Sequence, residues 1–86
     1  MVNVMSAIPE RLDTLLTRDR TAAALNEAGY PVKTKTLATM ATRGGGPPFQ
    51  KFSNRALYTW GSALAWAQSR LGPVITSTSQ VGGAEQ

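Results

Sequence analysis

Apolar residues recur at helical spacing in four stretches of the chain. In the first stretch, Leu12, Leu15 and Leu16 stand at positions i, i+3 and i+4 and so share one helix face. Pro9 suits the first position of such a helix, because proline lacks the N–H that a helix start leaves unpaired. The pattern predicts a short helix here, with the three leucines on the core.

The second stretch predicts a helix over residues 18–28. Thr17 can cap its N-terminus through the side-chain oxygen, and Gly29 can take the left-handed conformation that ends a helix. Small residues on the inner face would let another helix approach closely. The inner face consists of Ala22, Leu25 and Ala28.

The third predicted helix covers residues 35–43, with Thr34 favoured over Thr36 as its N-cap. Leu37, Met40 and Ala41 form its apolar stripe. The opposite face contains no acid and carries Lys35, Thr39, Thr42 and Arg43, with Thr36 near its edge. Threonine is a poor helix former, so several on one face indicate contact with a ligand, the alternative being an ordinary solvated face. Hydroxyls can reach phosphates, and threonine methyls can touch thymine.

A glycine- and proline-rich elbow leads from this helix into a predicted hairpin. Gly44–Gly46 permit unusual backbone angles, and Pro47–Pro48 stiffen the approach to the first strand. The two strand-like runs are residues 49–52 and 56–58. Residues 53–55 form the loop between them.

The loop of this hairpin carries turn residues, and Asn54 is suited to a left-handed conformation. A two-stranded hairpin is marginal alone, so it must pack on the helices. Its tip would stay in water with Arg55, and with Lys51 near by. The candidates for packing are Phe49, Phe52, Leu57 and Tyr58. A hairpin that only closes the core is the alternative interpretation.

Thr59 can cap the last predicted helix, which Gly72 and Pro73 terminate. Trp66 lies off its apolar stripe, so it either packs against the hairpin or marks a protein contact, and packing in the core or at its edge is favoured. The predicted stripe is Trp60, Ala63, Leu64, Ala67 and Leu71. We therefore expect a flexible N-terminus over residues 1–8, one domain over 9–72 and a flexible polar tail over 73–86.

Composition excludes most catalytic chemistry. The 86 residues allow one small domain, and the chain has no cysteine and no histidine. Only five acids are present, four of them within the first 27 residues, and none has the spacing of metal ligands. We expect no enzyme activity, no catalytic residue, no metal and no cofactor. No apolar run is long enough to span a membrane and no secretory leader is visible, so we expect a cytoplasmic protein.

The positive charge is concentrated in the second part of the chain. Residues 1–27 contain three arginines against four acids, a net charge of −1. Residues 28–84 contain six lysines and arginines and no acid, a net charge of +6. Cations without interspersed anions favour a nucleic-acid partner, whereas a merely solubilising surface usually mixes both signs.

Together these elements predict a mainly α fold with a small β-hairpin, in the order of a winged helix-turn-helix. The helices over 18–28 and 35–43 would be the helix-turn-helix pair, the second of them the recognition helix. The hairpin would be the wing.

The sequence resembles the small winged helix-turn-helix proteins of the excisionase and MerR-like group. This group includes phage excisionases, prophage regulators and the recombination directionality factors of integrative elements in alphaproteobacteria. Motifs between residues 16 and 71 carry the resemblance. They are Leu16-Thr17, Ala22-Ala23, Leu25, Gly29-Tyr30-Pro31-Val32, Thr36-Leu37, Arg43-Gly44-Gly45-Gly46-Pro47-Pro48-Phe49, Lys51, Arg55, Leu57-Tyr58 and Ala65-Trp66-Ala67-Gln68-Ser69-Arg70-Leu71.

The resemblance implies a function in DNA recombination, and with it a nucleoid-associated location. Its members place the second helix in a major groove and the wing in an adjacent minor groove. They bind repeated sites side by side, bend double-stranded DNA and direct a tyrosine or serine integrase towards excision. The candidate DNA contacts are Lys33, Thr34, Lys35, Thr36, Thr39 and Arg43 in the recognition helix, and Lys51, Ser53, Asn54 and Arg55 in the wing.

Three features depart from the group. Lys33 stands where a serine or similar cap is usual, and the usual acid near Ser62-Ala63 is missing. The ligand-binding extension of MerR activators is also missing, so drug or metal sensing is not implied. Regulation of transcription through the same surface is the alternative function, and a protein-interaction module without DNA contact is a third possibility.

Overall fold

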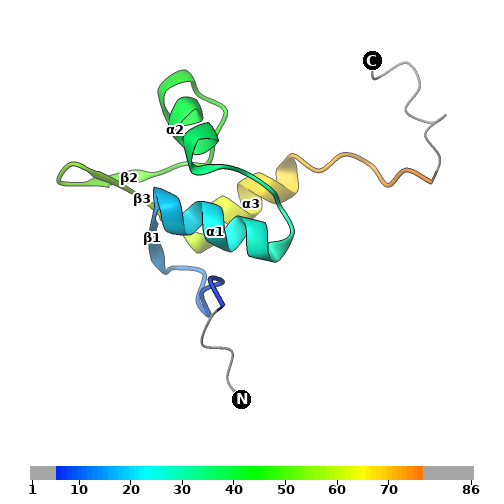
Figure 1. Ribbon diagram of the computed structural model, residues 1–86, viewed down its shortest axis with the longest axis horizontal. Helices are drawn as coiled ribbons and strands as arrows, with labels where there is room; N and C mark the ends of the chain where they lie inside the picture. Colours follow the sequence, from blue (N-terminus) through cyan, green and yellow to red (C-terminus); the bar gives the residue numbers. More distant parts are fainter. Residues whose placement is uncertain (1–5, 77–86) are drawn as a thin grey trace.

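Three helices and a three-stranded antiparallel sheet make up the protein in a computed structural model that describes residues 6–76 (Figure 1). The sheet has the strand order β1-β3-β2, so the first strand lies beside the last. Along the chain the elements are β1 (Leu15–Thr17), α1 (Arg18–Ala28), α2 (Thr34–Arg43), β2 (Gln50–Phe52), β3 (Arg55–Thr59) and α3 (Trp60–Ser69).

The predicted helix before residue 17 is wrong, because this segment is a turn followed by β1. Leu16 pairs with Tyr58 of β3, and only Leu16 of the three leucines is buried. Successive strand side chains point to opposite faces, so Leu15 is 52% exposed, and Leu12 in the turn is 62% exposed. The Gly61 N–H donates to the Leu12 carbonyl at 2.8 Å. Pairing with the distant β3–α3 segment thus replaces local helical hydrogen bonds.

The predicted bounds and caps of α1 are confirmed. The Thr17 hydroxyl accepts a hydrogen bond from the Arg20 N–H, and Gly29 ends the helix with φ of 106°. Ala24 and Leu25 are completely buried. The small side chain of Ala24 lets α1 lie close against α3, which crosses behind it in Figure 1.

The main core lies between α1, α3 and β1. Thr59 caps α3 as predicted, accepting from the Ser62 N–H. The helix ends at Ser69, before Leu71 can reach the core, so Leu71 is 64% exposed and its predicted burial is wrong. The core cluster consists of Leu16, Ala24, Leu25, Trp60, Ala63 and Ala67.

The elbow between α2 and β2 is pinned to α3. Gly44 and Gly45 have φ of 97° and 94°, angles that favour glycine. The Trp66 indole Nε1–H donates to the Gly45 carbonyl at 2.7 Å. Trp66 therefore packs at the edge of the core, one of the two roles predicted for it, and holds the elbow in place.

Gly46 is packed closely against α2, which predicts a cost for any side chain there. A Cβ at this position would lie 2.8 Å from the Met40 Cβ. We expect Gly46→Ala to lower the free energy of unfolding by about 1–3 kcal/mol, because either α2 or the elbow must shift to make room for the methyl group. Urea unfolding measures this change. Gly72→Ala is the control, since nothing lies within 4 Å of a Cβ there. Equal effects of the two substitutions would contradict this prediction.

Residues before the sheet contact the C-terminal end of α1. The Ala7 N–H and the Ser6 hydroxyl both donate to the Glu27 carboxylate at 2.8 Å and lower its pKa. Ala7 and Ile8 also pack against the core. The predicted flexible segments lie partly outside the described residues, at 1–5 and 77–86. Among residues 6–76, no helix is long and apolar enough to cross a membrane.

Candidate nucleic-acid interface

The orientation of α2 follows from one buried side chain. Leu37 is completely buried and is the single buried residue of this helix. Residues on the opposite side are exposed, as the pattern predicts; they are Lys35, Thr39, Thr42 and Arg43. Lys33 occupies the N-cap position without a side-chain hydrogen bond, so Thr34 lies inside the helix and does not cap it. The helix thus begins one residue earlier than predicted.

Two of the α2 threonines already use their hydroxyl protons. Thr39 donates to the Lys35 carbonyl at 3.1 Å and Thr42 to the Ala38 carbonyl at 3.4 Å. In this arrangement their hydroxyl oxygens can still accept, but contacting a phosphate as donors would require breaking these bonds. These two threonines therefore offer a ligand their methyl groups and their acceptor oxygens.

A groove runs between α2 and the β2–β3 hairpin, and we call it the α2–hairpin groove. It consists of two adjoining hollows of about 350 and 270 Å³. Both hollows are bordered by Arg18, Ala38, Asn54 and Ala56. Lys35 and Arg55 border the first hollow, whereas Thr42 and Lys51 border the second. The groove thus brings together cations from two elements that the sequence keeps apart.

Strand alternation places Lys51 and Ala56 on the groove side of the hairpin, whereas Arg55, which pairs with Phe52, borders the groove from the tip. Lys51 pairs with Ala56, so both side chains lie on one face of the sheet. Phe49 also packs there, with its ring centre 5.6 Å from that of Tyr58. Phe52 is three residues further along, points the other way and is 70% exposed, so it does not pack on the helices. At the hairpin tip, the left-handed residue is Ser53, with φ of 56°, and not Asn54.

Arg18 lies on the floor of the groove, and the sequence pattern does not predict it as a site residue. Its Nε donates to the Tyr58 hydroxyl at 2.9 Å, and its guanidinium carbon lies 5.8 Å from the ring centres of Phe49 and Tyr58. Arg18 belongs to the acid-rich N-terminal segment, and its partner Tyr58 is 40 residues away. No local signal in the sequence connects the two residues.

Asp19 also borders the groove, in the hollow that contains Lys35 and Arg55. Counting charges along the chain placed all acids outside the basic part, but α1 brings this carboxylate into it. Asp19 forms no ion pair within 4.0 Å among residues 6–76. The basic surface therefore includes one acid, at the edge formed by α1.

This position predicts opposite effects of Asp19→Asn on binding and on stability. For a polyanion such as duplex DNA bound at the groove, we expect the affinity to rise up to about fivefold, because an exposed charge that repels phosphate is removed. We expect the free energy of unfolding to fall by about 0.3–1 kcal/mol, because Asp19 lies in the first turn of α1. Fluorescence anisotropy and urea unfolding measure the two effects. Asp13→Asn, outside the groove, is the control and should leave the affinity unchanged; an unchanged affinity for Asp19→Asn would contradict the prediction.

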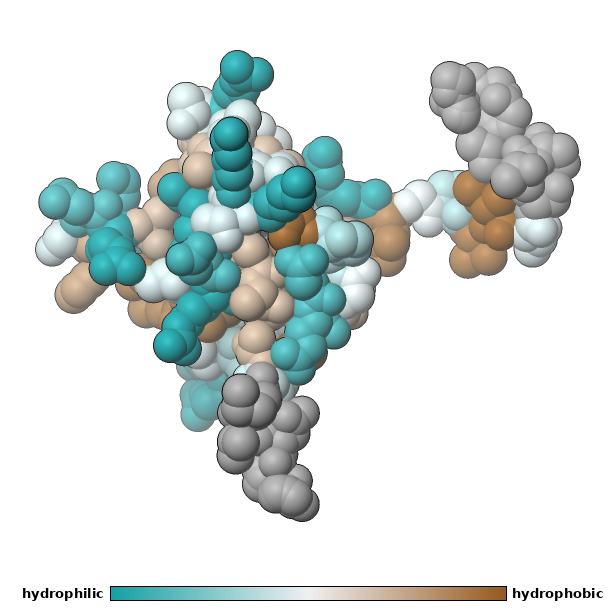
Figure 2. All heavy atoms as spheres, in the orientation of Figure 1, coloured by the Kyte–Doolittle hydropathy of each residue, from teal (hydrophilic) through white to brown (hydrophobic). Residues whose placement is uncertain are grey.

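The remaining candidate residues lie around these elements. Lys33 and Thr36 face the other flank of α2, in a hollow shared with Lys35, Thr39 and Met40. Arg43 is exposed at the C-terminal end of α2. Figure 2 shows hydrophilic residues gathered over α2 at the top and over the hairpin tip at the left. The candidates thus cover two flanks of α2 and the tip.

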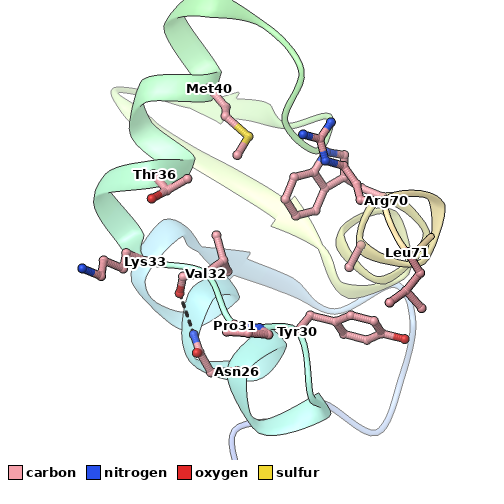
Figure 3. Close-up of a pocket in the computed structure, with 11 residues that line it drawn as sticks. Asn26, Tyr30, Pro31, Val32, Lys33, Thr36, Met40, Arg70 and Leu71 are labelled. Atoms are coloured by element: carbon pink, nitrogen blue, oxygen red, sulfur yellow. Dashed lines mark hydrogen bonds between the residues drawn. The ribbon is translucent and has the colours of Figure 1, made fainter. Parts of the chain in front are cut away.

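A second groove, of about 670 Å³, separates α2 from α3 (Figure 3). Met40 projects into it from α2, and the Asn26 amide donates to the Val32 carbonyl at 2.6 Å beside it. Arg70 stacks over the Trp66 ring at 5.6 Å along its wall. Its lining is mainly apolar and includes no acid. Across residues 6–76, no group of three histidine, cysteine or acidic side chains could hold a metal ion.

No protein-family model, curated protein or solved structure matches this chain. The functional conclusion therefore depends on the site itself.

Proposed function

We propose that this protein is a winged helix-turn-helix protein that binds double-stranded DNA. In this proposal α1 and α2, joined through Gly29, are the helix-turn-helix pair, and the β2–β3 hairpin is the wing. The observation that supports it most is that Lys35 of α2 and Arg55 of the hairpin border the same groove. A shared basic surface of two protruding elements suits the phosphates of a duplex.

The two elements would contact DNA in different ways. The exposed face of α2 offers methyl groups and acceptors to base edges in the major groove, flanked by cations for phosphates. The hairpin tip, with Ser53, Asn54 and Arg55, would reach the adjacent minor groove, while Lys51 neutralises phosphate. Phosphate contacts then set the affinity, and α2 sets the sequence preference.

As to biological role, we propose an accessory factor of site-specific recombination, because the sequence resembles the excisionase and MerR-like group. One copy covers few base pairs, so several copies would bind repeated sites side by side. Bending a site of 20–30 base pairs costs on the order of 1–6 kcal/mol, which the phosphate contacts of several copies offset. The bent duplex would favour the excisive complex of an integrase. Transcriptional regulation through the same surface is the second candidate role.

DNA binding is tested first. The dissociation constant for a duplex selected from random sequence is measured at several salt concentrations. We expect tight binding that weakens steeply with salt, with a slope of about one for each phosphate contact. Binding that is absent, or insensitive to salt, would refute the proposal and favour a protein-interaction module.

The biological role is tested separately. Excision by a site-specific integrase is measured with and without the protein, together with output from a promoter that carries the protein's binding site. Stimulated excision supports the recombination factor. Unchanged excision with altered promoter output supports the transcriptional regulator.

A further inference from the structure

Arg18 is a cation held in position by uncharged groups. The Tyr58 hydroxyl accepts from its Nε, and the Phe49 and Tyr58 rings lie 5.8 Å from the guanidinium carbon. The one ion pair within 4.0 Å among residues 6–76 joins Arg11 to Asp13, so no carboxylate neutralises Arg18. Among residues 6–76, its two terminal guanidinium nitrogens make no hydrogen bond beside the one that Nε donates to Tyr58. Much of the entropy cost of ordering this side chain is therefore met before any ligand arrives.

The groove around Arg18 is open to a ligand. Ala38 of α2 and Ala56 of β3 border both hollows, and such small side chains leave space beside the guanidinium. Lys35 and Arg55 flank it in one hollow and Lys51 in the other. A planar guanidinium with free N–H groups can donate two parallel hydrogen bonds to two oxygens of one phosphate. The ligand chemistry that fits is an anionic phosphate group on an extended chain.

The arrangement of duplex DNA indicates which phosphate this is. A sugar-phosphate backbone separates each major groove from the adjacent minor groove. A protein with α2 in the major groove and its hairpin in the minor groove must straddle that backbone. The part of the protein facing it is then the α2–hairpin groove, which has Arg18 on its floor.

We propose that Arg18 binds the DNA backbone phosphate that enters the α2–hairpin groove, between the contacts of α2 and those of the hairpin. This inference rests on the proposed DNA-binding function and adds a contact that the sequence did not indicate. Tyr58 and Phe49 are positioning residues, because they orient the guanidinium without touching the DNA.

The first test compares Arg18→Gln with Arg11→Gln on a duplex of about 20 base pairs selected with the wild-type protein. One lost phosphate contact should reduce the salt slope by about 0.9, which corresponds to about eightfold weaker binding at about 0.1 M salt. Arg11→Gln removes the same charge outside the groove and should leave the slope unchanged. Arg18→Lys keeps the charge and should restore most of the slope, which a purely structural role would not predict.

The second test identifies the phosphate by ethylation interference on the same duplex. With wild-type protein, ethylation of one phosphate between the α2 and hairpin footprints should block binding. With Arg18→Gln, ethylation at that phosphate should no longer matter, while other interfering positions remain.

The inference is overturned if the wild type binds DNA but Arg18→Gln keeps its salt slope and its interference pattern. It is also overturned if Arg18→Lys loses the same salt slope as Arg18→Gln and both variants melt below the wild type, since Arg18 would then act by packing. In both cases the proposed function survives. A wild-type protein that binds no duplex overturns both.

Discussion

Replacing Lys35 and Arg55 together with alanine should weaken duplex binding about 60-fold at about 0.1 M salt. The two side chains border one hollow of the α2–hairpin groove and come from its two walls. If each neutralises one phosphate, the salt slope falls by about 1.8, and the affinity at this salt concentration falls by the same power of ten. Both residues are exposed, so the fold should tolerate the change.

The matched control for this prediction is Arg11→Ala combined with Arg20→Ala. It removes the same net charge from exposed positions that do not border the groove. Fluorescence anisotropy at several salt concentrations should show a slope close to that of the wild type. If both double variants weaken binding equally, net charge alone attracts the DNA, and the groove has no special role.

Replacing Leu37 with alanine should cost about 2–5 kcal/mol of the free energy of unfolding. Leu37 is completely buried and alone among α2 residues anchors that helix by burial. Truncation would leave a cavity beneath α2 and remove apolar contacts that its partly buried neighbours, Met40 and Ala41, cannot replace. Such a loss is of the order of the total stability of a small domain. Urea unfolding followed by circular dichroism measures it.

Leu71→Ala is the control for Leu37→Ala, because it removes the same atoms from a side chain that is 64% exposed. Its expected effect is within about 0.5 kcal/mol. A similar loss for both variants would mean that Leu71 is covered in solution. A negligible loss for Leu37→Ala would contradict the packing of α2 described above.

The largest difference between prediction and structure lies just before α1. Leu12, Leu15 and Leu16 have helical spacing, yet Leu15 and Leu16 belong to a strand. Three leucines over five residues fit a helix face, and they also fit a strand that buries one of them. β3 favours the strand over the helix, because it supplies backbone hydrogen-bond partners for Leu16 from about forty residues away. Such a partner is invisible to local periodicity.

The candidate site was predictable in part. Lys35 and Arg55 were selected from the basic part of the chain, and the structure places them beside one groove. Arg18 and Asp19 were not selected, because the count of charges along the chain assigned them to the acidic segment. Their position depends on how α1 packs against the hairpin, which charge order does not encode.

The sequence by itself determined the parts of this protein whose causes lie within one turn or one helix. The caps Thr17 and Thr59, the left-handed Gly29 and the buried Leu37 were all visible, because a helix is formed by contacts between residues three or four apart. The tertiary structure alone decided that Leu15–Thr17 is a strand and that Arg18 meets Tyr58. These contacts join residues about forty positions apart, and their energies depend on packing that exists only once the helices have come together.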